Sequence, residues 1–380
     1  MSKQIRLRYD AQTVVRGECD TDNIGLNAIC PESWELNTEL RQPVTDRSAW
    51  NDAQLDADPR WRHVLSAVQR AELVGAARAM ARTESSSSTP DTDFIAIPTL
   101  KAHLETLAEE VAEGRGVALV RGIPLDEMTE PEMRAAYWCI ALAFGTPISQ
   151  NSKGELMADV TDHGNDIAKD NTRGYSTRAE LGFHSDMCEM TTLLCVNPAK
   201  RGGESKVASS MSVYNHILAH HREHLDVLHR GFHHHLRGEG PQADLDEITD
   251  HRVPVFSYHH ARLSCGFNPK ISRNGEFKRR GSFSDEETQA LACVSTTAAM
   301  PDLVHSMWLE RGDVQIVNNH TVLHSRTEYV DFEDVERKRR LWRLWLNPHR
   351  QRALTDDFAD RYNTGPRGGV AVGTGADYRF

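Results

Sequence analysis

The chain has 380 residues, of which 26% are charged and 39% hydrophobic, as is usual for a globular enzyme. Its formal net charge of −11 argues against nucleic-acid or anionic-membrane partners, because both bind basic surfaces. Seven scattered cysteines without a CxxC pair, no signal-peptide core and no run of 18 apolar residues predict a soluble protein of the reducing cytoplasm.

Three regions are expected along the chain. Residues 1–92 look like an accessory extension that packs on a catalytic domain at 93–350, and 351–380 form a C-terminal tail. In the extension, apolar residues at helical spacing predict a helix from Trp61 to Met80. The serine run Ser85–Ser88 then predicts an exposed linker.

A helix, a strand and a second helix are predicted next. Apolar residues recur at helical spacing from Leu100 to Val111, and Gly114 should end that helix. Val117–Val120 reads as a buried strand. The run Thr129–Glu132 combines a capping box with a proline in the first turn, which predicts a helix that ends near Gly145.

From about residue 150 the pattern becomes one of short strands separated by turns. Short strands separated by turns favour an antiparallel sandwich or barrel over alternating β-α units. Two helices should interrupt the strands at Ser212–His229 and Asp285–Ala299, the second with Ser284 as its N-cap and Glu287 three residues on. The predicted strands are Leu193–Val196, Lys206–Ala208, Val253–Tyr258, Asp313–Val317 and Leu341–Leu346.

The segment Leu181–Asp186 contains the first candidate metal ligands. His184 and Asp186 are two residues apart, so on a strand their side chains leave the same face. A single HxD triplet is weak evidence in a chain with 19 histidines. Two histidines and one carboxylate on one octahedral face are what a non-haem iron site needs, so a third ligand should lie downstream.

Downstream residues offer that ligand and a candidate anion site. His324 follows the predicted strand Asp313–Val317. Arg339 and Arg343 are four residues apart and would share one face of a strand. Inward-pointing arginines are costly unless they meet an anion, and the guanidinium group suits a carboxylate.

These motifs resemble the taurine dioxygenase and clavaminate synthase-like family of iron(II)- and 2-oxoglutarate-dependent oxygenases. The resemblance covers roughly residues 93–350 and depends on several motifs in order. Besides the HxD and the arginine strand, they are Arg121–Pro124, Phe144–Pro147, Arg173–Thr177, Pro198, Gly202–Ser205 and His324.

The resemblance implies a mainly β fold with flanking helices, built on a double-stranded β-helix, or jelly-roll. It implies that His184, Asp186 and His324 bind Fe(II), and that 2-oxoglutarate and O2 are consumed while a small organic molecule is oxidised, with release of succinate and CO2. An amino acid or natural-product intermediate would be the substrate. Because halogenating relatives have a small residue where Asp186 stands, hydroxylation is expected, with desaturation or cyclisation left open.

The resemblance also implies a set of co-substrate residues. Arg339 would pair with the distal carboxylate of 2-oxoglutarate, and Ser205, which stands where the family usually has threonine, would donate a hydroxyl to it. Arg343 matches a second family arginine that lies near the co-substrate or an anionic substrate. The choice among Arg339, Arg340 and Arg343 for the main contact stays open, as do the identity of the substrate and a homo-oligomeric state.

Two other functions fit parts of the pattern. A zinc-dependent hydrolase could use the same ligand set, but it would not need the arginines. A non-catalytic jelly-roll binding protein would not need a complete triad.

Several residues have more than one reading. His220 and His224 could bind zinc, although a solvated helix face is the preferred interpretation. His320 competes with His324, which the resemblance favours. Cys188 could line the pocket or be a small buried side chain, and Trp345 is expected to be core packing rather than a substrate platform.

Overall fold

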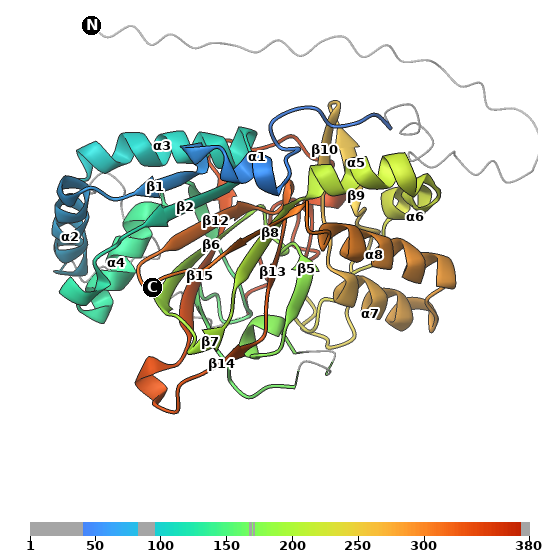
Figure 1. Ribbon diagram of the computed structural model, residues 1–380. Helices are drawn as coiled ribbons and strands as arrows, with labels where there is room; N and C mark the ends of the chain where they lie inside the picture. The colour runs from blue at the N-terminus through green and yellow to red at the C-terminus, as the bar shows by residue number, and fades with distance from the viewer. Residues whose placement is uncertain (1–40, 83–95, 167–168, 170–171, 374–380) are drawn as a thin grey trace, which may run out of the picture.

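Two β-sheets face each other across the centre of the molecule in the computed structural model (Figure 1), which describes residues 41–82, 96–166, 169 and 172–373. The larger sheet has seven strands in the order β1-β2-β12-β6-β15-β3, and β4 also pairs with β15. The smaller sheet has the order β11-β8-β13-β5. Only the β1–β2 pair is parallel among the described strands. The architecture is the predicted jelly-roll.

The strands of the larger sheet are β1 (Arg62–Val64), β2 (Val117–Arg121), β3 (Gly145–Ile148), β4 (Met157–Val160), β6 (Met190–Asn197), β12 (Val314–Asn318) and β15 (Arg340–Pro348). Those of the smaller sheet are β5 (Leu181–His184), β8 (Ser205–Ser209), β11 (Val304–Met307) and β13 (Val322–Arg326). Two short pairs complete the set: β7 (Arg201–Gly202) with β14 (Tyr329–Val330), and β9 (Phe256–His259) with β10 (Arg262–Cys265).

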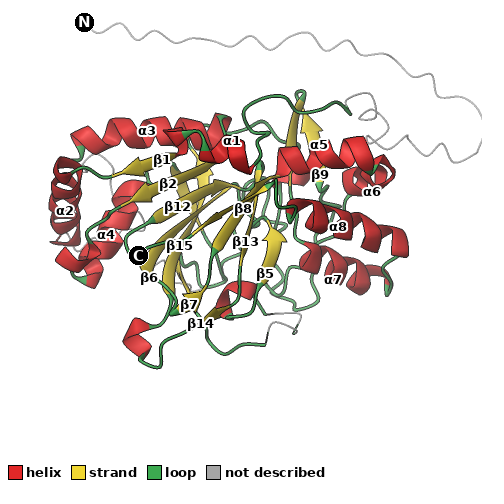
Figure 2. Cartoon of the chain, in the orientation of Figure 1, coloured by secondary structure: helices red, strands yellow, loops and turns green. Residues whose placement is uncertain are grey.

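Most helices form two groups on opposite sides of the molecule (Figure 2). One group packs on the larger sheet: α2 (Ala67–Arg82), α3 (Pro98–Glu113) and α4 (Glu130–Ala141). The other group lies beside the smaller sheet: α5 (Ser210–His220), α6 (Leu225–Arg230), α7 (Pro269–Arg280) and α8 (Asp285–Ala298). The short helices are α1 (Asp52–Asp56) and α9 (Asp356–Ala359).

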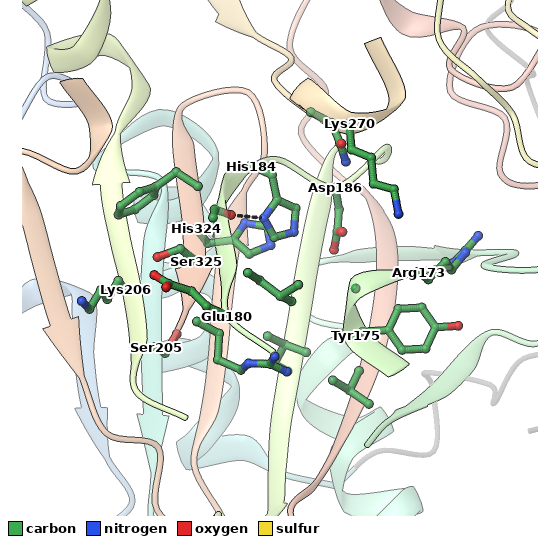
Figure 3. Close-up of a pocket in the computed structure, with 18 of the residues that line it drawn as sticks. Arg173, Tyr175, Glu180, His184, Asp186, Ser205, Lys206, Lys270, His324 and Ser325 are labelled. Carbon is green, nitrogen blue, oxygen red and sulfur yellow. Dashed lines mark hydrogen bonds between the residues drawn. The ribbon is translucent and has the colours of Figure 1, made fainter. Parts of the chain in front are cut away.

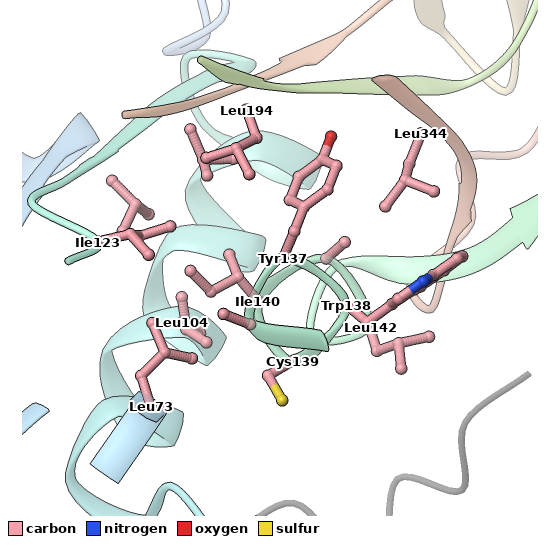
Figure 4. Close-up of a cluster of buried hydrophobic side chains, with 14 of the residues drawn as sticks. Leu73, Leu104, Ile123, Tyr137, Trp138, Cys139, Ile140, Leu142, Leu194 and Leu344 are labelled. Atoms are coloured by element: carbon pink, nitrogen blue, oxygen red, sulfur yellow. The ribbon is translucent and has the colours of Figure 1, made fainter. Parts of the chain in front are cut away.

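The largest hydrophobic core lies between the larger sheet and its helices (Figure 4). Tyr137 and Ile140 on α4 pack with Leu194 on β6 and Leu344 on β15, and all four side chains are buried. The Tyr137 hydroxyl keeps a hydrogen bond to Thr192 Oγ1 at 2.6 Å, so its burial leaves no orphaned polar atom. This packing fixes β6 and β15, the two central strands that border the candidate site.

Most predicted elements are confirmed. Helix α3 ends at Gly114, and α4 begins at Thr129 with the expected capping box to Glu132. Helix α8 has the predicted N-cap Ser284, again with a capping box. The predicted strands at Leu193, Lys206, Asp313 and Leu341 fall within or next to β6, β8, β12 and β15, while the Val253–Tyr258 strand begins later, at Phe256 in β9.

Two predictions about helices were wrong, and one helix was missed. The helix expected from Trp61 begins only at Ala67, because Arg62–Val64 pairs with β2 instead. The helix expected over Ser212–His229 is divided into α5 and α6, because His221 has non-helical backbone angles (φ −141°, ψ 41°). Helix α7 was not anticipated. The Ser85–Ser88 linker lies outside the described residues.

Residues on both sides of the predicted catalytic domain pack on the jelly-roll. The N-terminal part supplies β1 and α2, and after β15 the buried residues Phe358 and Tyr362 pack back on the core. The division at 1–92, 93–350 and 351–380 stays a prediction. Within the described ranges, no helix combines the length and apolarity needed to cross a bilayer.

Candidate active site

Three side chains of the expected type converge inside the jelly-roll (Figure 3). His184 ends β5 and is paired directly with His324 on β13, so the two imidazole rings lie 4.4 Å apart, centre to centre. Asp186 follows two residues after His184, just beyond the end of the strand. One ligand atom from each residue lies within 4.8 Å of the others, and no second trio of this kind occurs in the described part of the chain.

Both histidines have a ring nitrogen that a metal could use. The Nδ1 of His184 lies 2.9 Å from the carbonyl oxygen of Gly182, which fixes the proton on Nδ1 and leaves Nε2 free. Burial, with a smaller contribution from His184, lowers the pKa of His324 to about 3. Its buried Nδ1 has no hydrogen-bond partner. Neutral imidazoles with an unused nitrogen are suited to a divalent metal.

Asp186 is held as a carboxylate by its neighbours. Its Oδ2 accepts hydrogen bonds from Thr191 Oγ1 at 2.8 Å and from the indole Nε1 of Trp345 at 3.1 Å. Burial would raise the pKa of Asp186, but the positive charge of Arg343, whose Nη1 lies 3.6 Å from Oδ2, helps to hold that pKa well below its usual range. Both hydrogen bonds fall on Oδ2, so Oδ1 remains for a metal.

The loop that carries Asp186 is tied to the turn that precedes β13. Asn319 accepts a hydrogen bond from the Asp186 backbone N–H at 3.0 Å and donates one to Thr191 Oγ1, also at 3.0 Å. Sequence reasoning missed Thr191 and Asn319, and it assigned Trp345 to core packing alone. The threonine pair Thr191 and Thr192 in a mostly apolar strand was the available signal.

His320, the rival of His324, lies elsewhere. It is buried in the turn between β12 and β13, and its Nε2 is 3.6 Å from Glu189. Cys188 does not line the cavity around the triad; it is buried, and its thiol contacts Thr191. His220 ends α5 and therefore shares no helix with His224; its imidazole neighbour one turn away is His216, at 4.6 Å between ring centres.

The arginines of the β15 region separate into two groups. Arg339 and Arg343 are buried and line the cavity that contains the triad. Arg340 points to the other face, where it binds Asp159 at 2.6 Å and Glu130 at 3.3 Å. The alternation of side chains along a strand accounts for this difference. Of the three candidates, Arg340 is thus the one kept out of the cavity.

Arg339 has a second buried guanidinium beside it that was not anticipated. Arg326 lies two residues after His324 on β13, and both Arg326 and Arg339 lie over the ring of Tyr329, at 4.7 and 4.9 Å from its centre. Neither forms an ion pair with a carboxylate of the described residues, and one Nη1 atom of each has no hydrogen-bond partner. Burial, and then the charge of Arg339, lowers the pKa of Arg326 to about 10.

Two residues of the Gly202–Ser205 motif border this pair. A Cβ at Gly203 would lie 3.2 Å from Arg339 Nε, and the backbone φ of Gly203 is +78°, so a side chain there would be both strained and crowded. Ser205 lines the cavity, but its hydroxyl donates to Gln315 Oε1 at 2.8 Å. It must therefore rotate before it can donate to a ligand.

One cavity of about 720 Å³ joins the triad and these arginines. That volume is within the usual range for small-molecule sites. The lining includes the ring of Tyr175, whose centre lies 4.6 Å from the guanidinium of Arg343. A half-buried three-ligand set next to guanidinium groups without a carboxylate partner among the described residues can hold a divalent metal together with a dicarboxylate.

Sequence comparison finds relatives that span most of the chain. Residues 84–345 match the family model described as taurine catabolism dioxygenase TauD, TfdA family. The chain is 34% identical over 314 residues to FR-33289 synthase of Streptomyces rubellomurinus, covering 81% of this chain and 91% of that protein. It is 23% identical over 320 residues to the taurine hydroxylase-like protein SAT17 of Stachybotrys chartarum, covering 80% of each.

Solved structures share the fold at low sequence identity. An asparagine oxygenase in complex with Fe(II), 3-hydroxyasparagine and succinate aligns with a TM-score of 0.59 and 17% identity, covering 75% of this chain and 93% of that one. The non-haem iron oxygenase OrfP in complex with Fe aligns with a TM-score of 0.53 and 16% identity, covering 75% and 94%.

Proposed function

Because this chain belongs to the TauD, TfdA family of dioxygenases, we propose that His184, Asp186 and His324 bind Fe(II) and that Arg339 binds 2-oxoglutarate. The chain is an iron(II)- and 2-oxoglutarate-dependent oxygenase that acts on a small organic molecule. The family gives no support to the zinc hydrolase or the non-catalytic binding protein.

The observation that carries the assignment is the buried pair Arg326 and Arg339 in the cavity of the triad. Two guanidinium groups that have no carboxylate partner in the described part of the chain are expensive to bury unless a ligand supplies the anion. The distal carboxylate of 2-oxoglutarate can accept parallel hydrogen bonds from Arg339. Arg326 adds a second positive charge, and we assign it to the same carboxylate.

When bound, iron supplies the oxidative chemistry, in which O2 and 2-oxoglutarate become succinate and CO2 while a substrate C–H bond is oxidised. The residues of the protein supply the metal ligands and hold them in place. His184 and His324 each offer a ring nitrogen, and Asp186 offers one oxygen while Trp345 and Thr191 hold the other by hydrogen bonds. Arg343 stabilises the Asp186 carboxylate, so that the ligand stays deprotonated.

We expect an amino acid or a related natural-product intermediate as the substrate, with hydroxylation as the outcome. The solved relatives are described with hydroxylated asparagine or arginine, which supports this substrate class. The presence of a carboxylate at Asp186 supports hydroxylation over halogenation. Net charge supports a small-molecule partner rather than nucleic acid or membrane.

The test is an anaerobic titration of the iron(II)-loaded protein with 2-oxoglutarate, followed by visible spectroscopy. We expect a charge-transfer band in the wild-type protein and none in His324→Ala, which lacks a ligand. His320→Ala is the matched control and should keep the band. A wild-type protein that holds iron but forms no band would contradict the proposal, as would an undiminished band in His324→Ala.

A further inference from the structure

A second polar cluster lines the cavity, and its member Arg173 lies on the Asp186 side, away from Ser205 (Figure 3). It consists of Arg173, Arg237 and Tyr362, which we call the Arg173 cluster. Arg173 caps a short turn before β5, Arg237 lies in the loop after α6, and Tyr362 follows α9. All three line the cavity, although none belongs to a jelly-roll strand.

The Arg173 cluster has more positive than negative charge. Arg173 and Arg237 share one carboxylate, Glu239: Arg173 donates to its Oε1 from Nε at 2.6 Å, and Arg237 Nη2 lies 3.3 Å from its Oε2. The two arginine side chains are only 13% and 12% exposed. Glu239 itself does not line the cavity. One positive charge therefore remains largely buried, which is costly without an anion.

The Arg173 cluster also has unused hydrogen-bond donors. Among the residues that the structure describes, the Nε of Arg237 and the hydroxyl of the fully buried Tyr362 have no hydrogen-bond partner. Buried donors are normally satisfied, and two orphans on neighbouring side chains indicate a missing acceptor. A guanidinium N–H and a phenol both suit an oxyanion.

The backbone at Arg237 gives an independent indication. Its φ is +59°, in the left-handed region that non-glycine residues rarely adopt. Such a conformation is unfavourable and persists only where the surroundings impose it, often at ligand sites. Here it places the guanidinium of Arg237 beside Glu239, at the wall of the cavity.

The indole ring of Trp345 contacts both the Arg173 cluster and the candidate metal site. The guanidinium carbon of Arg173 lies 5.5 Å from the ring centre of Trp345, and that of Arg343 lies 4.7 Å from the same centre. The indole N–H of Trp345 binds Asp186. A small molecule can therefore contact the Arg173 cluster and the space beside the triad at the same time.

We propose that the Arg173 cluster binds an oxyanion group of the primary substrate, either a carboxylate, a sulfonate or a phosphonate. This inference rests on the proposed function, because the anion would hold a C–H bond beside the triad. The charged side chains around the cavity agree with this proposal. Seven cationic side chains and two carboxylates line the cavity of a chain whose net charge is −11. These residues are Arg173, Lys206, Arg237, Lys270, Arg326, Arg339 and Arg343, against Glu180 and Asp186.

The experiment is anaerobic calorimetry on protein loaded with Fe(II) and 2-oxoglutarate. Four probes of similar size are titrated: butyrate, propane-1-sulfonate, propylphosphonate and the neutral butyramide. We expect at least one oxyanion to bind, ten-fold or more tightly than butyramide. Arg173→Gln and Arg237→Gln should each weaken that binding at least ten-fold. Arg178→Gln, which changes an exposed arginine outside the cavity lining, should alter it less than two-fold.

The charge-transfer band with 2-oxoglutarate is read before any probe is added. Its absence from the wild-type protein would contradict the proposed function, whereas a normal band without oxyanion binding would overturn only the Arg173 cluster proposal. If Arg173→Gln and Arg237→Gln bound the oxyanion as tightly as the wild-type protein, the Arg173 cluster proposal would be overturned as well. A variant that forms no band is replaced by its Arg→Lys counterpart, which keeps the charge and should retain binding that Gln loses.

Discussion

The indole N–H of Trp345 donates a hydrogen bond to Oδ2 of Asp186, over 3.1 Å. A residue at the centre of β15 thus orients a candidate metal ligand that comes from a loop beyond the other sheet. The sequence suggested only core packing for Trp345, and its ring is indeed 2% exposed. The side chain of Trp345 therefore both packs in the interior and orients the candidate ligand Asp186.

Removal of this donor should weaken metal binding. Trp345→Phe keeps an aromatic ring but loses the N–H, so Asp186 is held by Thr191 with less constraint. Loss of such a supporting bond typically costs about 10- to 100-fold in metal affinity. Anaerobic Fe(II) titration measures it. Trp342→Phe is the matched control, since that indole N–H has no partner, and equal losses in both variants would contradict the role of Trp345.

Arg339 should control the affinity for 2-oxoglutarate and not the affinity for iron. Arg339→Gln removes one charge from the buried pair, and we expect at least a ten-fold weaker 2-oxoglutarate titration with Fe(II) binding unchanged. Arg340→Gln removes an equal charge from the opposite face of β15, where Asp159 is its partner. Arg340→Gln is therefore the control. If it weakened 2-oxoglutarate binding as much as Arg339→Gln does, the overall charge and not the position of Arg339 would determine the affinity.

Arg326 should oppose folding in the absence of a ligand. Its guanidinium is buried next to Arg339 with one nitrogen unsatisfied. Arg326→Met replaces an uncompensated charge with an apolar side chain of similar length, so the free energy of unfolding without 2-oxoglutarate should rise by about 1 kcal/mol or more. Urea unfolding measures this. The same variant should bind 2-oxoglutarate more weakly, and a variant that is less stable would refute the explanation.

Glu276 should make the protein sensitive to acid. Burial would raise the pKa of this side chain, but hydrogen bonds from His233 and the charge of Arg252 outweigh it and lower the pKa from 4.5 to about 2. A carboxylate whose pKa is lower in the folded than in the unfolded protein stabilises the fold at pH values above its unfolded pKa of about 4.5. This stabilisation is lost as the pH falls from about 4.5 to 2. We expect this effect to contribute at most about 3 kcal/mol.

Glu276→Gln should therefore be less stable than the wild type at pH 7 and should lose less stability between pH 4.5 and 2. Unfolding by urea at a series of pH values gives both quantities. Glu333→Gln, at an exposed position, is the control and should follow the wild-type curve. A Glu276→Gln curve that keeps the wild-type slope in acid would contradict the assignment of that slope to Glu276.

The sequence predicted what depends on local chemistry. Capping boxes at Thr129 and Ser284 and a stop at Gly114 gave helix ends correctly, because those signals act within a few residues. The spacing of His184 and Asp186 suggested a common site even though β5 ends before Asp186. The alternation along β15 suggested which arginines share a face.

What the sequence did not predict depends on distant partners. Arg62–Val64 is a strand because β2 lies beside it, and local periodicity favoured a helix there. Asn319 meets Asp186 and Thr191 only after two segments more than 120 residues apart converge. Arg237 and Tyr362 reach the cavity from loops whose course no periodicity determines. Tertiary contacts decide such positions, and a single sequence does not encode them in its spacing.

The parallel strand β1 gives the N-terminal region a protective role. It lies at the edge of the larger sheet, is three residues long and covers β2, whose sequence Val117–Arg121 is almost wholly apolar. A short edge strand offers few free backbone groups to another molecule, whereas a bare β2 would offer five residues of apolar β-structure. Residues 62–64 thus protect the sheet from adding strands of other chains, and a chain shortened past them should form aggregates even where its catalytic residues are intact.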